Sequence, residues 1–553
     1  MHRTIVWCII VNAWLCVAPT EATRIFDADS DSAHLPPAAT AGEQTHPIAF
    51  HVEYQQIDAG VNKAEVETYL TAALSYMASI VHVHGPAPAP LLLPRPCAVT
   101  QTWSDGRQEC IQEAPLNSCL QAFHNASFFD QTRICSGLHP GDCHIEGSHN
   151  PPLAADVVLY VTATAGGENG MVHCGRQDAA LASSMSGPSG SLAAAGGACA
   201  VDGATGRPIA GAVNICPERL MMLRTASTFS RDSLVMDCVH ELLHVLAFSE
   251  ALYGSFRDRN GITSVDGRLL VRSSAVVAVA KAHFNCPSLI GVPLEDDGGD
   301  GTANTHWEMR TLNGELMVGT VLAGQRPSLS DFTLAFLEDT GWYAPRYSLA
   351  SPLAWGRGAG CGFVTASSCH STPKTVQTRF FCSPTAVGAQ CTFDSLAVGT
   401  CIQLPLTKQQ EQCFVVAPYS NWVCRDSSLA DADRALWGNS FGAGSRCVAG
   451  GEHPWSRSQG HLVYTQDEPT AGCFLTSCTG GGVAQVSIAG ESLACPAGAN
   501  ISVPMFKGTL GPCPSDLCVS LACKNDCNAN GDCSAGLCVC WPGWKGADCS
   551  QAA

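Results

Sequence analysis

Residues 237–250, DCVHELLHVLAFSE, combine side chains that are suited to metal chemistry. If this stretch is helical, His240 and His244 lie four residues apart and therefore on one face of the helix. Two imidazoles so placed can bind one metal ion, and Glu241 between them can reach a metal-bound water. A catalytic zinc site of this kind needs three protein ligands, so the chain must supply a third.

The same stretch would also form an ordinary buried amphipathic helix. In that interpretation both histidines are satisfied by hydrogen bonds. The apolar side chains that recur at helical spacing would then face the core: Leu234, Val235, Cys238, Leu242, Val245 and Leu246. In either interpretation we expect the helix to start near residues 231–233, whose polar side chains can cap the free amides.

Two residues are candidates for the third ligand. Glu250 lies six residues beyond His244, but Ala247 stands between them and lacks the freedom of glycine to reverse the chain sharply. His306 lies in residues 305–320, THWEMRTLNGELMVGT, and Met317 follows it eleven residues later.

Residues 305–320 resemble the leishmanolysin family of metzincin zinc peptidases. In that family a long insertion separates the H-E-x-x-H helix from a third histidine, which is followed by an M-R…E-L-M run. The flanking segments 273–310, 334–348 and 352–363 have the same character. The resemblance covers about residues 46–500 and is clearest over residues 157–369.

The resemblance favours His306 over Glu250 as the third ligand. It implies that three histidines hold one Zn²⁺, that Glu241 is the general base and that Met317 forms a Met-turn beneath the metal. It also implies a disulfide between Cys286 and Cys361, which would help to fix the segment carrying His306.

The chain departs from the family pattern at three points. Ala247 replaces an expected glycine, which leaves the end of the helix in doubt. Residues 23–96 contain no cysteine, so latency through a cysteine that blocks the metal is not expected. Cys238, two residues before the first ligand, is either a disulfide partner or an unpaired thiol.

The elements around this helix predict an α+β catalytic domain, and the resemblance implies that it is of the metzincin type with a long insertion. Residues 63–84 show helical spacing of apolar positions, and residues 156–165 and 209–217 are rich in β-forming side chains. Residues 183–197 are rich in Gly, Ser and Ala, so we expect a loop there. A disulfide-rich region of loops and strands and a small terminal module follow.

The chain has 31 cysteines, a density that indicates disulfides in an oxidising compartment. Six of them within residues 523–549 resemble an EGF-like module. The module's family pattern implies the pairs Cys523–Cys533, Cys527–Cys538 and Cys540–Cys549. Such a unit can close independently, so we expect deletion of residues 521–553 to leave hydrolysis of a short peptide largely intact and to change binding to cell-surface or matrix material instead.

The amino terminus predicts a secretory signal peptide, because a basic residue is followed by an apolar run and then by small residues suited to cleavage. The alternative is an uncleaved membrane anchor. We expect no other membrane-spanning segment. The predicted organisation is a signal peptide at 1–22, a flexible leader at 23–45, an N-terminal catalytic subdomain at 46–252, a central subdomain with the third histidine and the Met-turn at 253–360, a cysteine-rich domain at 361–520 and the EGF-like module at 521–550.

These features predict a secreted zinc endopeptidase that acts on extracellular or cell-surface proteins. We also expect a cell-surface or matrix partner for the EGF-like module and glycosylation at Asn125 and Asn500. A net charge of −18 argues against a nucleic-acid partner. The alternative is an adhesion protein that uses the peptidase scaffold only for display, although degenerate peptidases usually lose one of the four motif residues.

Overall fold

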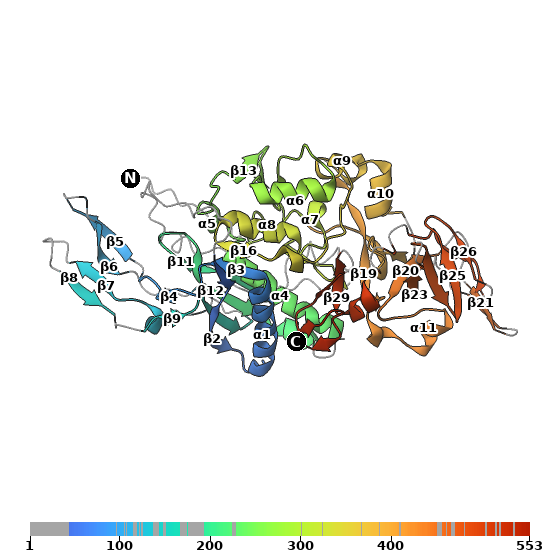
Figure 1. Cartoon of the computed structure of the whole chain (residues 1–553), viewed down its shortest axis with the longest axis horizontal. Coiled ribbons are helices and arrows are strands. Elements are labelled where there is room, and N and C mark those ends of the chain that lie inside the picture. Colours follow the sequence, from blue (N-terminus) through green and yellow to red (C-terminus); the bar gives the residue numbers. More distant parts are fainter. Residues whose placement is uncertain are drawn as a thin grey trace, which may run out of the picture.

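The computed structural model describes most of the chain (Figure 1). It covers residues 44–552 apart from 96, 104–105, 107, 114–118, 121, 123–124, 136–142, 148–150, 166–173, 175–192, 224–227, 300, 323, 367, 386–387, 409–410, 451–455, 460–461, 466–470, 480–481, 504–505, 515–516, 519–520, 522 and 535–536. The predicted signal peptide and nearly all of the predicted leader therefore lie outside the described residues.

A four-stranded sheet supports the helix that carries His240 and His244. Its order is β11 (Ala194–Val201), β12 (Pro208–Ile215), β10 (Val157–Ala163) and β2 (Phe50–Ile57). β10 runs parallel to both of its neighbours, and β11 is antiparallel to β12. Every residue of β10 and β12 is buried, as expected for central strands covered on both faces. The strands predicted at 156–165 and 209–217 are confirmed.

Two long helices cover one face of this sheet, α1 (Lys63–Ile80) and α4 (Thr228–Leu246) (Figure 1). Side chains alternate along β10, so Leu159 and Val161 enter the core with these helices. Val158 and Tyr160 point to the other face and pack with Leu93 and Phe129.

Three sequence-based boundaries are wrong. The helix predicted at 63–84 ends at Ile80, because the alternating Val81–His84 forms β3 and pairs with β1 (Thr45–Pro47) and β16 (Tyr343–Pro345). Helix α4, which carries His240 and His244, starts at Thr228, so residues 231–233 lie inside it and not at its start. Residues 194–197 of the predicted loop belong to β11, while most of the remainder lies outside the described residues.

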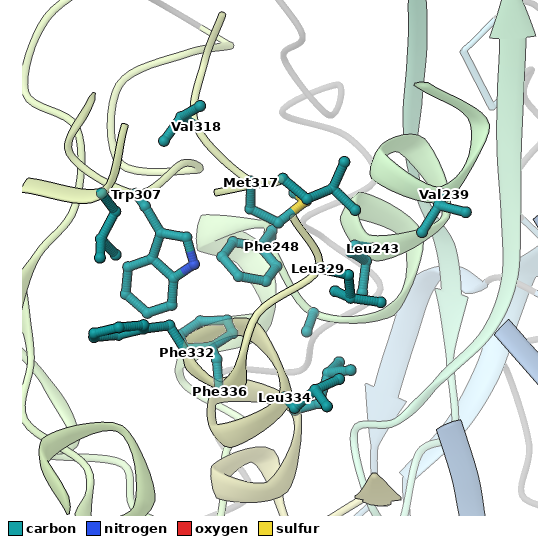
Figure 2. Packing of buried hydrophobic residues seen from close by; sticks show 14 of the residues in the cluster. Val239, Leu243, Phe248, Trp307, Met317, Val318, Leu329, Phe332, Leu334 and Phe336 are labelled. Carbon is teal, nitrogen blue, oxygen red and sulfur yellow. The ribbon is translucent and has the colours of Figure 1, made fainter. Parts of the chain in front are cut away.

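The central segment adds short helices and a small sheet above the main sheet (Figure 1). Its aromatic core joins Phe248 at the end of α4 to Trp307, Phe332 and Phe336 (Figure 2). The elements are α5 (Glu250–Tyr253), β13 (Ile262–Val265), β14 (Arg268–Val271), α6 (Ser274–Phe284), β15 (Val292–Pro293), α7 (Met309–Leu312) and α8 (Asp331–Thr340).

The segment after residue 360 is built mainly from small antiparallel sheets (Figure 1). Arg268 and Lys408 both pair with Asp296, and Arg268 also pairs with Glu411, so ion pairs join this segment to the central one. The main elements are α9 (Cys361–Val364), α10 (Lys374–Phe380), β17 (Gln390–Cys391), β18 (Ala397–Gln403), β19 (Phe414–Val423), α11 (Ala432–Leu436), β20 (Ser445–Ala449), β23 (Ala471–Cys478), β24 (Ala484–Ile488) and β25 (Glu491–Cys495).

A separate four-stranded sheet projects from the body at the left of Figure 1. Its strands are β5 (Cys97–Thr102), β6 (Gln108–Glu113), β7 (Thr132–Cys135) and β8 (Cys143–Glu146). Most of their residues are exposed or half-buried, and two disulfides within the sheet supply part of the stabilisation that a core would give.

The EGF-like module, with β29 (Gly531–Ser534) and β30 (Leu537–Cys540), is docked against the rest of the chain. Buried Asp526 forms ion pairs with Arg446 at 2.7 Å and with Arg425 at 3.3 Å. The guanidinium carbon of Arg326 lies 3.5 Å from the centroid of the Trp541 ring. The module is therefore part of the folded body and does not hang from it as a free unit.

The structure joins 28 cysteines in fourteen disulfides within the part of the chain that it describes. Among those residues only Cys238 is unpaired, and it is buried in α4. The pairs implied by the two resemblances are present: Cys286–Cys361, Cys523–Cys533, Cys527–Cys538 and Cys540–Cys549. No helix in the described ranges is long and apolar enough to cross a membrane.

Candidate metal centre

Three histidines from two distant parts of the chain meet in one place. His240 and His244 extend from one face of α4, and His306 comes from the loop that precedes α7. Their Nε2 atoms form a triangle with sides of 3.0, 3.1 and 3.1 Å. His244 and His306 are buried, and His240 is half-buried.

A backbone carbonyl fixes the tautomer of each ring. Nδ1 of His240 lies 2.8 Å from the Leu316 oxygen, that of His244 lies 2.8 Å from the Phe248 oxygen, and that of His306 lies 2.9 Å from the Thr302 oxygen. A carbonyl oxygen can only accept a hydrogen bond, so each neutral ring carries its proton on Nδ1. Every Nε2 then directs a lone pair into the triangle.

This arrangement fits a tetrahedral metal ion. Three facing lone pairs cannot hydrogen-bond with one another, and a cation between them would make their close approach favourable. Zinc lies about 2.0–2.1 Å from histidine nitrogen, which places two tetrahedral ligand nitrogens about 3.3 Å apart. The observed triangle is within a few tenths of an ångström of that spacing. Three protein ligands leave the fourth position open, as in catalytic zinc sites.

The electrostatics also keep the rings neutral. Burial lowers the pKa of His306 to about 3, helped by the neighbouring His240. Burial and the two other rings lower the pKa of His244 well below its usual range, and burial lowers that of His240. Neutral imidazole is the form that binds metals.

Glu241 follows His240 on α4 and is buried. Burial raises its pKa to about 8 and the charge of Asp237 adds to this, while a hydrogen bond from the Gly196 backbone lowers it. Gly196 lies on β11, where an added Cβ would stand only 2.4 Å from the Glu241 carbonyl oxygen. The strand therefore approaches α4 this closely because residue 196 has no side chain.

The structure also describes Glu250, the other candidate for the third ligand, and Ala247, which stands where a glycine is expected. Glu250 is exposed at the start of α5 and is not part of the triangle formed by the described histidines. Ala247 follows the end of α4 with a negative φ, so the chain turns there without needing glycine.

Met317 is fully buried and shares its core with Val239, Leu243 and Phe248 (Figure 2). Its carbonyl accepts a hydrogen bond from the backbone N–H of Trp307, the residue after the third histidine, at 2.8 Å. The segment around Met317 therefore lies between the α4 ligands and the His306 loop.

Sequence reasoning missed the groups that orient the rings. The Leu316, Phe248 and Thr302 carbonyls belong to the backbone, and no side-chain pattern marks them. Glu315 was also missed, although it lies in the E-L-M run that contains Met317.

The two glycosylation candidates differ in their surroundings. The Asn125 side chain is engaged at both ends, accepting from Ser127 and donating to Glu53. Asn500 is exposed. The structure therefore leaves Asn500 the more accessible of the two.

Comparisons with known proteins show which families the chain is similar to. The family model described as leishmanolysin matches residues 178–530, and a teneurin-like EGF domain matches residues 523–552. A leishmanolysin-like peptidase of Drosophila melanogaster is 28% identical over 437 residues, covering 68% of this chain and 59% of the relative.

Other relatives bear similar names. The ciliated left-right organizer metallopeptidase of Danio rerio is 31% identical over 331 residues, covering 57% of this chain and 50% of the relative. A leishmanolysin-like peptidase of Caenorhabditis elegans is 37% identical over 202 residues, or 29% of this chain and 30% of the relative. The matches span less than two thirds of the length of each of these relatives.

Proposed function

The chain belongs to the leishmanolysin family, which is zinc-dependent in general, and on this premise we propose that it is a zinc endopeptidase. His240, His244 and His306 are the proposed ligands of one Zn²⁺. Glu241 is the proposed general base, and Met317 is the proposed floor of the site.

One observation carries this proposal: three Nε2 lone pairs converge while each Nδ1 is held by a carbonyl. A histidine cluster that served only the core would pair each Nε2 with a hydrogen-bond donor, whereas here the Nε2 lone pairs face one another. The fit to a tetrahedral ion and the free fourth position both support a catalytic centre over a closed structural one.

The residues have separate tasks in the proposed hydrolysis. When bound, zinc supplies Lewis acidity, which polarises the scissile carbonyl and lowers the pKa of a water molecule. Glu241 takes the proton of the attacking water and delivers it to the leaving amine. A proton acceptor works best with a pKa near the working pH, and burial moves Glu241 in that direction.

We infer that the substrates are extracellular or cell-surface proteins. The fourteen disulfides of the described residues fit an oxidising compartment, and the predicted signal peptide would lead there. We also propose that the EGF-like module binds a cell-surface or matrix partner. The binding surface would be the side of the module that does not contact the rest of the chain.

The substitution Glu241→Gln tests the mechanism. Glutamine keeps the shape of the side chain but cannot take a proton, so zinc content and thermal stability should stay close to those of the wild type. Proton transfer by a positioned group contributes about 10²–10⁴-fold, and here one group transfers two protons. Hydrolysis of a broad peptide library should therefore fall by about 10⁴-fold, measured as kcat/KM beside metal analysis of the same samples.

Two results would count against the proposal. A Glu241→Gln protein that hydrolyses peptides at the wild-type rate would remove Glu241 as the base. A wild-type protein that binds zinc and cleaves no peptide in the library would favour the display scaffold instead.

A further inference from the structure

Glu315 is a fully buried carboxylate that lies against the amino end of α8, and it accepts four hydrogen bonds. Oε1 accepts from the Ser330 hydroxyl at 2.9 Å, the Ser330 amide at 3.2 Å and the Thr333 hydroxyl at 2.6 Å. Oε2 accepts from the Met317 amide at 2.5 Å. A negative group is favoured at the amino end of a helix, and these donors compensate its burial.

The first link from Glu315 to the metal centre is a single peptide group. Leu316 C=O and Met317 N–H belong to the same planar peptide, and in a trans peptide they point in opposite directions. Glu315 holds the N–H at one end, and Nδ1 of His240 donates to the C=O at the other. The Glu315 carboxylate therefore sets the direction of the carbonyl that orients His240.

The second link runs to the segment of His306. The Trp307 amide donates to the Met317 carbonyl at 2.8 Å, and its indole N–H donates to the Thr333 hydroxyl at 3.0 Å. That hydroxyl in turn donates to Glu315. Trp307 follows His306 directly, so the same carboxylate is connected to two of the three proposed ligands.

We propose that Glu315 is a positioning residue for the metal centre, which holds the Leu316–Met317 peptide and, through it, the ring of His240. This inference rests on the proposed function. It assigns Glu315 no contact with substrate or metal. A purely structural role would instead confine its effect to the stability of the core around α8.

The substitution Glu315→Gln separates these roles. The amide oxygen should stay toward Ser330 and Thr333, which offer three donors, so the amide NH₂ would face the Met317 N–H and lose that bond. Groups that orient metal ligands typically change metal affinity by about 10–100-fold. We expect zinc affinity to fall by about 10-fold or more and the visible spectrum of the Co²⁺-substituted protein to shift.

The matched control is Asp394→Asn, which changes a carboxylate that, like Glu315, accepts hydrogen bonds from a hydroxyl and a backbone amide, but from Thr392 and Leu396 in the cysteine-rich segment. It should lower stability and leave the Co²⁺ spectrum and zinc affinity unchanged.

If Glu315→Gln does not fold, Thr333→Val can be measured instead. This substitution removes one donor to Glu315 and the acceptor of the Trp307 indole. That variant should shift the same spectrum by a smaller amount.

The outcomes distinguish this inference from the proposed function. Wild-type protein that binds zinc, together with a folded Glu315→Gln protein of unchanged zinc affinity and Co²⁺ spectrum, would overturn the positioning role alone. An unchanged spectrum in Thr333→Val would do the same where Glu315→Gln is unfolded. Wild-type protein that binds no zinc would overturn the proposed function and this inference with it.

Discussion

The three histidines of the triangle are held by different parts of the fold. His244 donates to Phe248 at the end of its own helix, so its orientation is local. His240 depends on the Leu316 carbonyl, and His306 depends on Thr302 within its own loop. His240 is thus the ligand whose ring orientation depends on a distant residue, 76 positions along the chain.

Removing His306 should separate the two candidates for the third ligand. We expect His306→Ala to lower zinc content sharply, because structural zinc sites bind with about 10–16 kcal/mol and one of three ligands contributes several kcal/mol of this. Glu250→Ala should keep the zinc, because Glu250 is exposed at the start of α5. Metal analysis after dialysis checks both variants, and the reverse pattern would rule out His306.

At the scale of elements, the contact between β11 and α4 determines where Glu241 lies. The strand has glycine at positions 196 and 197, and both have ordinary negative φ angles. An added Cβ at Gly196 would stand 2.4 Å from the Glu241 carbonyl oxygen, whereas one at Gly197 would meet no atom within 4 Å. Neighbouring glycines in one strand therefore face different constraints.

The matched pair Gly196→Ala and Gly197→Ala tests this contact. Gly196→Ala should lower the free energy of unfolding by about 1–3 kcal/mol, because backbone atoms must move apart to admit the methyl group. It should also lower peptide hydrolysis, since β11 supplies a hydrogen bond to Glu241. Gly197→Ala should leave stability unchanged or slightly raised. Equal chemical denaturation curves for the two variants would contradict this account.

Strand β11 is an element that the sequence did not predict, in contrast to β10, β12 and the helix α4. The two α4 ligands follow from the helical period alone, and the buried strands β10 and β12 follow from their β-branched composition. Residues 194–201, AAGGACAV, contain mostly poor β-formers, so a loop was expected for the part up to residue 197. Their strand structure comes from pairing with β12 and from close packing on α4, which composition does not reveal.

The third ligand marks a similar limit. His306 lies 62 residues beyond His244, and no periodicity connects the two. Its choice over Glu250 came from the resemblance to a family and not from spacing. Glu315 could have been noticed as an acid beside Met317, but its four donors come from residues 317, 330 and 333, whose meeting depends on the tertiary fold.

At the scale of the whole molecule, the EGF-like module connects two parts of the chain. Asp526 is bound by Arg425 and Arg446 of the cysteine-rich segment. Trp541 contacts Arg326, which follows the Met317 segment of the central part. Deletion of residues 521–553 would leave two buried arginines without their carboxylate. The deletion is therefore expected to destabilise the protein and not only to change binding, in contrast to the expectation from sequence.

Asp526→Asn is the sharper test of this docking. Removing one partner of a buried ion pair costs about 3–5 kcal/mol, because the remaining charge stays buried and uncompensated. We expect thermal unfolding at a lower temperature at neutral pH. Lys524→Ala is the control within the same module: its side chain is 72% exposed and pairs only at the surface, so unfolding should be unchanged.

The pH dependence of the Asp526→Asn effect should identify its cause as charge. Burial alone would raise the pKa of Asp526, but hydrogen bonding and charge from Arg446 and Arg425 outweigh this and lower it. A lowered folded pKa contributes stability above the ordinary aspartate pKa of about 3.9 and loses it as the pH falls through the folded value. The stability difference between wild type and Asp526→Asn should therefore be constant from pH 7 to about pH 5 and shrink below pH 4. A difference that persists undiminished at pH 3 would show that the module is held by packing around Trp541 and not by the carboxylate of Asp526.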